Sequence, residues 1–211
     1  MTAAAPVCRV PPVAPGRMGP LARLAGAVAA RATGGEPPRV ITTLARHRRL
    51  LRRWLPFGAG LLRGDLPGPD RELLVLRTAW RCGAWYEWCQ HATLARRAGL
   101  LAAEVERIPA GPGAPGWSPR QGLLLTAADE LCEHHVVTDA TWAALARELS
   151  EPELIELCLL VGHYAMLALA LNSLGVEPEA GARRRLLPGA AALADRLRDR
   201  LAEARAGRSA A

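Results

Sequence analysis

The chain has 211 residues, of which 50% are hydrophobic and only 4% aromatic, and it carries a formal net charge of +7. A chain of this length forms one domain, or two similar halves around a shared core, and Leu and Ala must fill most of that core. The 27 strongly basic residues are all arginine, and no zinc-finger, recognition-helix or base-stacking pattern accompanies them. We therefore expect no nucleic-acid partner, and we interpret the arginines as solvated helix faces and subunit contacts.

The N-terminal part predicts an arm followed by two helices. Residues 1–19 are rich in Pro and Ala and predict an extended arm. A helix is expected over residues 21–33, then a loop over 34–38. Leucines at helical spacing predict a second helix over 41–55, which Pro56 ends or kinks because proline lacks the N–H that a helix interior needs.

The middle of the chain predicts three helices and a linker. A helix over residues 70–81 runs to a Cys-Gly break, and the next, over 84–98, ends at Gly99. Glycine is favoured there because the residue after a helix often takes a left-handed conformation. A short helix over 101–108 precedes a Gly/Pro-rich linker over 109–117.

Two capping boxes open the helices of the second half. Ser118 with Gln121, and Ser150 with Glu153, fit the pattern in which the first side chain caps a helix and the fourth reaches back. They predict helices over Pro119–His134 and Glu151–Leu174. Shorter helices are expected over 139–148 and 190–206. No strand-like alternation occurs, so the sequence predicts an all-α fold.

Two similar segments suggest a diverged internal repeat. Glu72-Leu-Leu-Val-Leu and Glu153-Leu-Ile-Glu-Leu each begin an apolar helix that ends at a glycine. We expect the domain to span 20–180, with halves over 20–108 and 118–180. A C-terminal helix and tail then occupy 181–211, where an amphipathic helix could pack on a partner subunit.

The sequence favours a protein without a membrane span. The most apolar run, residues 157–171, has 15 residues and contains His163, whereas a span needs about 20 apolar residues. Arginines interrupt the N-terminus, which therefore lacks the apolar core of a secretion signal. Five cysteines, an odd number, indicate reduced thiols. We expect a cytoplasmic location.

The segment after the Cys-Gly break carries the candidate chemistry. Glu87 and His91 are four residues apart, so a carboxyl group and an imidazole share one face of a helix. Trp85, Tyr86 and Trp88 surround them, as in the wall of a binding site. The alternatives are a surface Glu–His contact, and tryptophans that belong to the core.

These residues also carry a family resemblance. The pattern R-E-L-x-x-L-R, a short break, and then Y-E-W-x-x-H-x-x-x-A-x-x-x-G-L resembles the carboxymuconolactone decarboxylase / alkylhydroperoxidase D-like superfamily. A second stretch, residues 131–175, fits the same group. The resemblance implies an alkylhydroperoxidase D-like helical bundle, a homo-oligomer and a small-molecule substrate.

The absence of two cysteines indicates which branch of that superfamily the chain resembles. Redox members carry C-x-x-C-x-x-x-H; aligning His91 with that histidine puts Ala84 and Glu87 at the two cysteine positions. Glu72 falls where redox members have a glutamate that relays protons. The E-x-x-x-H of decarboxylase-like members, by contrast, matches Glu87 and His91.

The resemblance therefore implies an acid/base enzyme, a decarboxylase or related lyase or isomerase, that needs no metal or organic cofactor. Its substrate would be a small oxygenated or carboxylate-bearing molecule, and cyclic compounds are among the candidates. Glu87 and His91 would exchange a proton with it, Glu72 would orient His91, and Tyr86 would bind an oxyanion.

Four further side chains are candidate substrate contacts: Trp85, Trp88, His163 and Tyr164. His163 and Tyr164 lie in the apolar helix of the second half. The alternative to a role in substrate binding is that they form a hydrogen-bonded pair in the core. Cys132-Glu133-His134-His135 resembles a metal cluster, but adjacent residues of a helix diverge by about 100°, so we expect no metal site.

Two other functions stay open. The first is a thiol-dependent peroxidase using Cys82 and Cys89. On one continuous helix their Cα atoms would lie about 10 Å apart, beyond the roughly 4.4–6.8 Å that a disulfide spans, although the break at Gly83 could bend the path. The second is a non-catalytic ligand-binding oligomer.

Overall fold

The computed structural model describes residues 8–33 and 35–207, and within them it contains helices and no strand. The all-α prediction is confirmed. Part of the expected arm (residues 1–7), Gly34 of the expected first loop and the end of the expected tail (208–211) lie outside the described residues. The α-helices are α1 Pro20–Thr33, α2 Arg39–Leu44, α3 Arg48–Leu61, α4 Gly68–Arg81, α5 Trp85–Ala98, α6 Ala102–Arg107, α7 Pro119–His134, α8 Asp139–Leu145, α9 Glu151–Leu174 and α10 Pro188–Arg205, with 3-10 turns η1 Pro15–Arg17, η2 Ile108–Ala110 and η3 Arg183–Arg185.

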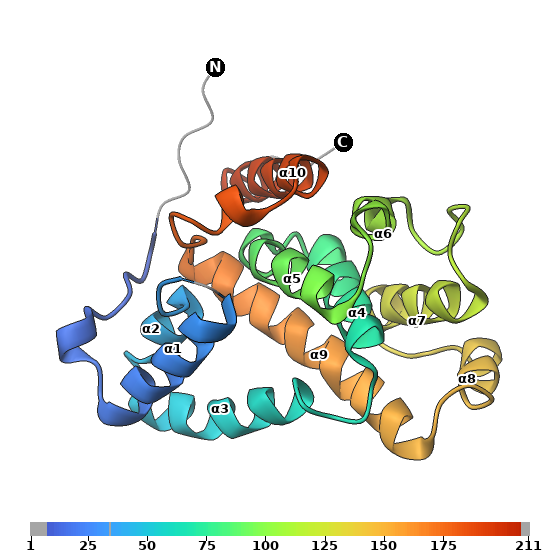
Figure 1. Cartoon of the computed structure of the whole chain (residues 1–211), viewed down its shortest axis with the longest axis horizontal. Coiled ribbons are helices and arrows are strands. Elements are labelled where there is room, and N and C mark those ends of the chain that lie inside the picture. Colours follow the sequence, from blue (N-terminus) through green and yellow to red (C-terminus); the bar gives the residue numbers. More distant parts are fainter. Residues whose placement is uncertain (1–7, 34, 208–211) are drawn as a thin grey trace.

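Helix α4 lies at the centre of the fold. It packs against α5, α7 and α9, and four consecutive residues, Leu73 to Leu76, are fully buried. Since successive residues of a helix point about 100° apart, four buried in a row mean that α4 is covered on all sides. The long α9 runs diagonally across the molecule beside it (Figure 1).

The other helices cover this centre from three directions. Helices α1 to α3 lie together on one side, α7 and α8 on the opposite side, and α10 lies over α5 and α6 (Figure 1). Of these outer groups, the N-terminal one contacts α5 through α1 and α9 through α3. That placement decides where a cavity forms.

Local signals set the ends of several helices where the sequence predicts them. Helices α7 and α9 have the predicted bounds, and the Ser118 side chain accepts the backbone N–H of Gln121 at 3.2 Å. Gly99 (φ 108°) follows α5 and Gly175 (φ 75°) follows α9, both in the left-handed region. That region is costly for residues with a Cβ, so glycine ends each helix without strain.

The N-terminal region differs from its prediction in one helix. Residues 41–55 do not form one helix: α2 ends at Leu44, and the His47 side chain then caps α3 by accepting the N–H of Leu50 at 3.3 Å. Of the two effects expected of Pro56, it does not end the helix, because it lies inside α3. The described part of the arm is held to the end of α9, where the N–H groups of Arg9 and Val10 both donate to the Leu174 carbonyl at 3.0 Å.

Helix α9 has two properties that follow from its apolar sequence. Among the described residues it is the one helix long and apolar enough to cross a membrane, although here 56% of its most apolar window is buried inside the protein. On its outer side it leaves a row of large apolar side chains exposed to solvent: Ile155, Leu159, Met166 and Leu169.

Candidate active site

A cavity of about 590 Å³ lies where the N-terminal helices face α5 and α9. Its walls are mainly apolar side chains of α1, α2 and α3, such as Leu24, Val28 and Ile41. The polar residues come chiefly from the other side. They are Tyr86, Glu87, Gln90 and His91 of α5, and His163 and Tyr164 of α9.

Two neighbouring helices hold Glu72 against His91. Gly83 (φ 62°) reverses the chain between α4 and α5, so the helices pack side by side. Glu72 Oε2 then lies 2.8 Å from His91 Nδ1, and both side chains are more than nine-tenths buried. When Nδ1 donates its hydrogen to the carboxylate, Nε2 is left as the nitrogen that can accept a proton.

Glu87, in the first turn of α5, is a buried carboxyl group without a partner. The residue is 2% exposed, and neither carboxyl oxygen has a hydrogen-bond partner in the protein. Burial raises its pKa well above the ordinary value of 4.5. The helix N-terminus favours the charged form by about 0.3–1 kcal/mol at an exposed site, and here desolvation outweighs it, so burial favours the neutral, protonated form of Glu87.

Helix α9 brings His163 and Tyr164 to the same cavity. The Tyr164 ring meets the His91 ring edge to face, with ring centres 4.9 Å apart, and His163 stacks on Trp54 of α3 at 5.8 Å. Burial, and secondarily the neighbouring His91, lowers the pKa of His163. His163 Nδ1 and Trp54 Nε1 are buried without hydrogen-bond partners. Sequence reasoning did not single out Trp54, which stands far from the motif.

Tyr86 lies at the cavity but has a structural task. Its hydroxyl donates to Glu179 Oε1 and accepts from the Val40 N–H, both at 3.1 Å. Gln90 donates to the other oxygen of Glu179. The predicted oxyanion-binding role is therefore corrected: the hydroxyl is already engaged, and it ties α5 to α2 and to the segment after α9. No motif in the sequence pointed to Glu179.

Trp85 and Trp88 do not line the cavity, which corrects the prediction that they contact substrate. Trp88 is fully buried in the core between α5 and α10, where its Nε1–H donates to the Ala190 carbonyl at 3.0 Å. Trp85 packs against the same cluster. In a helix, these positions point about 100° or more away from Glu87, toward α10.

The cysteines lie outside the cavity. Cys89 is buried in the α5–α10 core, where burial above all raises the pKa of its thiol to about 12. Cys82 hydrogen-bonds to Cys132 of α7; this bond raises the pKa of Cys82 and lowers that of Cys132. Among the described residues, no group of three His, Cys, Asp or Glu side chains could hold a metal ion.

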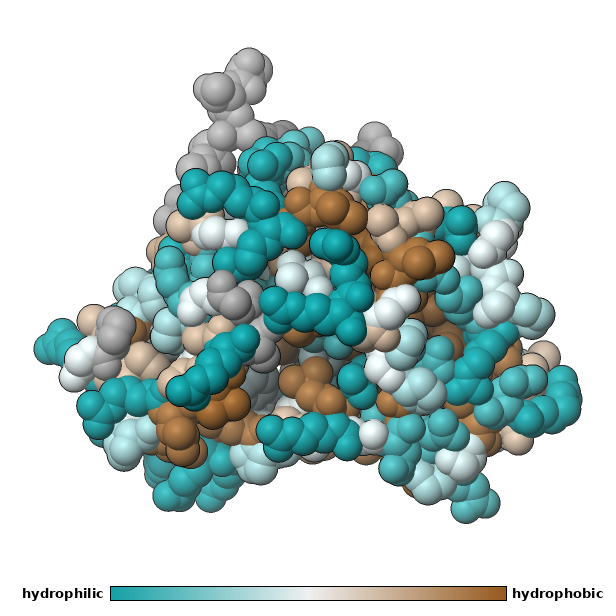
Figure 2. Space-filling view, viewed as in Figure 1, coloured by the Kyte–Doolittle hydropathy of each residue, from teal (hydrophilic) through white to brown (hydrophobic). Residues whose placement is uncertain are grey.

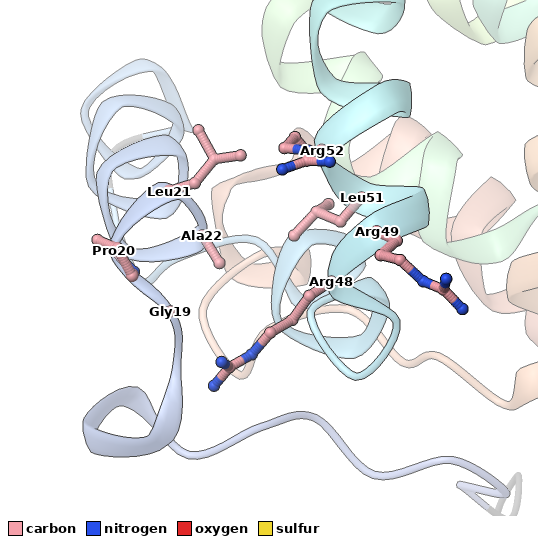
Figure 3. Close-up of a pocket in the computed structure, with 8 residues that line it drawn as sticks. All are labelled: Gly19, Pro20, Leu21, Ala22, Arg48, Arg49, Leu51 and Arg52. Atoms are coloured by element: carbon pink, nitrogen blue, oxygen red, sulfur yellow. The ribbon is translucent and has the colours of Figure 1, made fainter.

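A second, smaller hollow of about 190 Å³ lies between the start of α1 and α3. Leu21, Ala22 and Leu51 lie between the two helices, Arg48 reaches from α3 toward Gly19 at the start of α1, and Arg49 points away (Figure 3). The arginines that line it are exposed, as expected for a solvated face.

The chain is similar to a known protein family in sequence and to solved structures in fold. Residues 48–130 match the carboxymuconolactone decarboxylase family. A peroxidase-related protein from Ralstonia eutropha JMP134 with an alkylhydroperoxidase AhpD core is similar in structure, with a TM-score of 0.75, 20% identity, and coverage of 85% of this chain and 96% of that one. A peroxidase-related protein from Silicibacter sp. TM1040 has a TM-score of 0.72 and 15% identity, covering 86% and 96%.

A third solved structure is a variant of the debrominase Bmp8 in complex with 2,3,4-tribromopyrrole. It has a TM-score of 0.74 and 15% identity, covering 86% of this chain and 97% of that one. At these identities the likenesses establish the fold. No curated protein matches the chain in sequence.

Proposed function

Because residues 48–130 match the carboxymuconolactone decarboxylase family, and because the cavity joins a Glu–His pair to a second buried carboxyl group, we propose that this chain is an acid/base enzyme of the carboxymuconolactone decarboxylase / alkylhydroperoxidase D-like superfamily that works with side chains alone. The observation that carries the proposal is Glu87, a buried carboxyl group with neither oxygen bonded. Strongly perturbed ionisable groups in a cavity are typical of catalytic sites.

The residues divide the work between a base and an acid. His91 Nε2, with Nδ1–H held by Glu72, removes a proton from a carbon next to a substrate carbonyl. Glu87, neutral because it is buried, donates its proton to the carbonyl oxygen as the carbon–hydrogen electron pair moves into the new C=C bond. The product is an enol, His91 is left as imidazolium, and Glu87 as carboxylate. When the enol O–H returns its proton to Glu87 and His91 returns its proton to the same carbon, the result is hydrogen exchange; when the enol is conjugated with a further C=C bond and His91 protonates the far carbon of that system, the result is an isomerisation.

The same groups support a lyase reaction. When a carboxylate beside the carbonyl leaves as carbon dioxide, its bonding electron pair becomes an enolate, and a proton from Glu87 or His91 completes the product. A cyclic, oxygenated substrate fits either route. The small ring of 2,3,4-tribromopyrrole in the similar Bmp8 structure supports a cyclic substrate here.

A homo-oligomer is part of the proposal. The exposed apolar row of α9 supports it, since large apolar patches on a protein surface mark interaction sites. Sedimentation velocity measures the assembly directly, and a monomer at micromolar concentration would contradict this part. We also propose a cytoplasmic location, on the odd cysteine number.

The function is tested by deuterium exchange. Cyclic ketones are incubated with the protein in D₂O, and loss of the hydrogen next to the carbonyl is followed by NMR. Glu87→Gln, which keeps the shape of the side chain but cannot cycle a proton, is expected to lower the exchange rate by about 10²- to 10⁴-fold. Glu72→Gln is expected to lower it less, because Glu72 acts through His91.

A matched control is Glu203→Gln, since Glu203 is exposed on α10. Its exchange rate should equal that of the unmodified protein. Ketone binding without exchange in the unmodified protein would favour the non-catalytic ligand-binding function.

The thiol peroxidase alternative needs its own measurement. Cys82 meets Cys132, not Cys89, so the relevant variants are Cys82→Ser and Cys132→Ser. Thiol-dependent reduction of a hydroperoxide that both variants abolish, in a protein inactive in the exchange assay, would replace the acid/base proposal.

A further inference from the structure

We propose that the substrate is an uncharged, largely apolar molecule of medium size, with its polar group at the Glu87–His91 end of the cavity and its apolar body between α1, α3 and α9. This rests on the proposed function and narrows it. It favours proton transfer on a neutral carbonyl compound over loss of carbon dioxide from a carboxylate.

The charge of the walls is the first argument. Of the described residues that line the cavity, one is an arginine, Arg63, and its side chain is exposed beyond the end of α3. The positive partner that His91 could offer is already paired with Glu72 at 2.8 Å. A substrate carboxylate would therefore enter an apolar space beside Glu87 without a free cation, and burying an unpaired charge is strongly unfavourable.

The missing hydrogen-bond partners are the second argument. Glu87 offers two oxygens without partners, and Trp54 Nε1 and His163 Nδ1 are buried at the same cavity without partners. A buried polar atom left without a partner costs about 1–3 kcal/mol. A ligand carbonyl or hydroxyl oxygen can accept a hydrogen bond from a protonated Glu87 or from Trp54 Nε1–H, whereas a purely hydrocarbon ligand cannot.

The size and shape of the space are the third argument. A volume of about 590 Å³ is in the range of sites for drug-sized ligands, roughly 300–1,000 Å³. Leu24 and Val28 of α1 and Leu62, directly after α3, line the cavity and are also exposed to solvent. Apolar side chains gather on the surface over α1 and α3 (Figure 2). An apolar ligand can thus enter the cavity past exposed apolar side chains.

The test uses two matched series of probes. The neutral fluorophore N-phenyl-1-naphthylamine is bound to the protein and displaced at neutral pH by straight-chain 2-alkanones of increasing length, or by fatty carboxylates of equal length. We expect ketone affinity to rise about fourfold for each added methylene until the cavity is full. Each carboxylate should bind at least about tenfold more weakly than its ketone.

Two variants that fill part of the cavity test whether the ketones bind there. Ala25→Phe on α1 and Ala59→Phe on α3 each place a ring in the cavity wall, away from Glu87 and His91. Both are expected to shorten the longest ketone that binds. The two variants lie on different helices, and the fold of each is checked by circular dichroism. The test therefore remains valid if one of them does not fold.

The outcomes separate this inference from the proposed function. Tighter binding of carboxylates, no dependence on chain length, or no effect of either folded variant would overturn the inference while deuterium exchange could still stand. Selective ketone binding with no exchange of any bound ketone would support the inference about the cavity and overturn the proposed function.

Discussion

Replacing Glu87 by Gln should remove a pH dependence of stability that burial of this carboxyl group creates. Burial raises the folded-state pKa of Glu87 well above 4.5, so the folded protein holds a proton that the unfolded chain releases. Below about pH 4.5 the group is neutral in both states, and its contribution is fully present. As pH rises toward the folded-state pKa, unfolding releases the proton, and the free energy of unfolding falls by about 1.4 kcal/mol per pH unit.

The magnitude follows from that slope. Gln is neutral at every pH, so below about pH 4.5 the difference in stability between Glu87→Gln and the unmodified protein should not change with pH. For each pH unit above that, up to the folded-state pKa, the variant should gain about 1.4 kcal/mol relative to the unmodified protein. For a chain of this length that corresponds to a melting temperature higher by about 3–6 °C per pH unit.

The assay is urea unfolding followed by circular dichroism at a series of pH values, comparing the difference between the two proteins at each pH. Glu203→Gln, at an exposed position of α10, is the control and should show no pH-dependent difference. A difference between Glu87→Gln and the unmodified protein that stays constant with pH would refute the reasoning, because it would mean that Glu87 is ionised in the folded state.

Three further substitutions test other parts of the structure. Gly83→Ala should lower the free energy of unfolding by about 1 kcal/mol in urea titrations, because φ is 62° there while a Cβ would meet no neighbour; no loss would argue against this turn. Trp88→Phe, which removes the bond to Ala190, should lower the melting temperature but leave deuterium exchange unchanged, and lost exchange in a folded variant would return this residue to the site. Arg77→Leu removes both 2.7 Å bonds to Asp129 but leaves Arg81 at 3.5 Å from this carboxylate, so it should destabilise the fold by about 1.5–3 kcal/mol by denaturant titration, whereas a loss under 1 kcal/mol would mean the pair contributes little.

Most of the helices could be predicted from the sequence, because nearby residues set where they begin and end. The capping boxes at Ser118 and Ser150 mark where α7 and α9 begin, and Gly99 and Gly175 mark where α5 and α9 end. Such signals depend on a few neighbouring residues and not on distant contacts, so they can be recognised in the sequence alone. The helix predicted over residues 41–55 was wrong because its leucine spacing continues through the break at His47, where a side-chain cap starts a new helix.

The sequence by itself determined the all-helical class, the match of residues 48–130 to the carboxymuconolactone decarboxylase family, and the four-residue spacing that puts Glu87 and His91 on one helix face. Helical spacing sets directions within an element, but it does not say which neighbour each face meets. Tertiary packing decided that Trp88 faces α10, that Trp54 meets His163 across the cavity, and that Glu72 of α4 reaches His91. It also raised the pKa of Glu87, because desolvation depends on everything that surrounds a group and not on its neighbours in the chain.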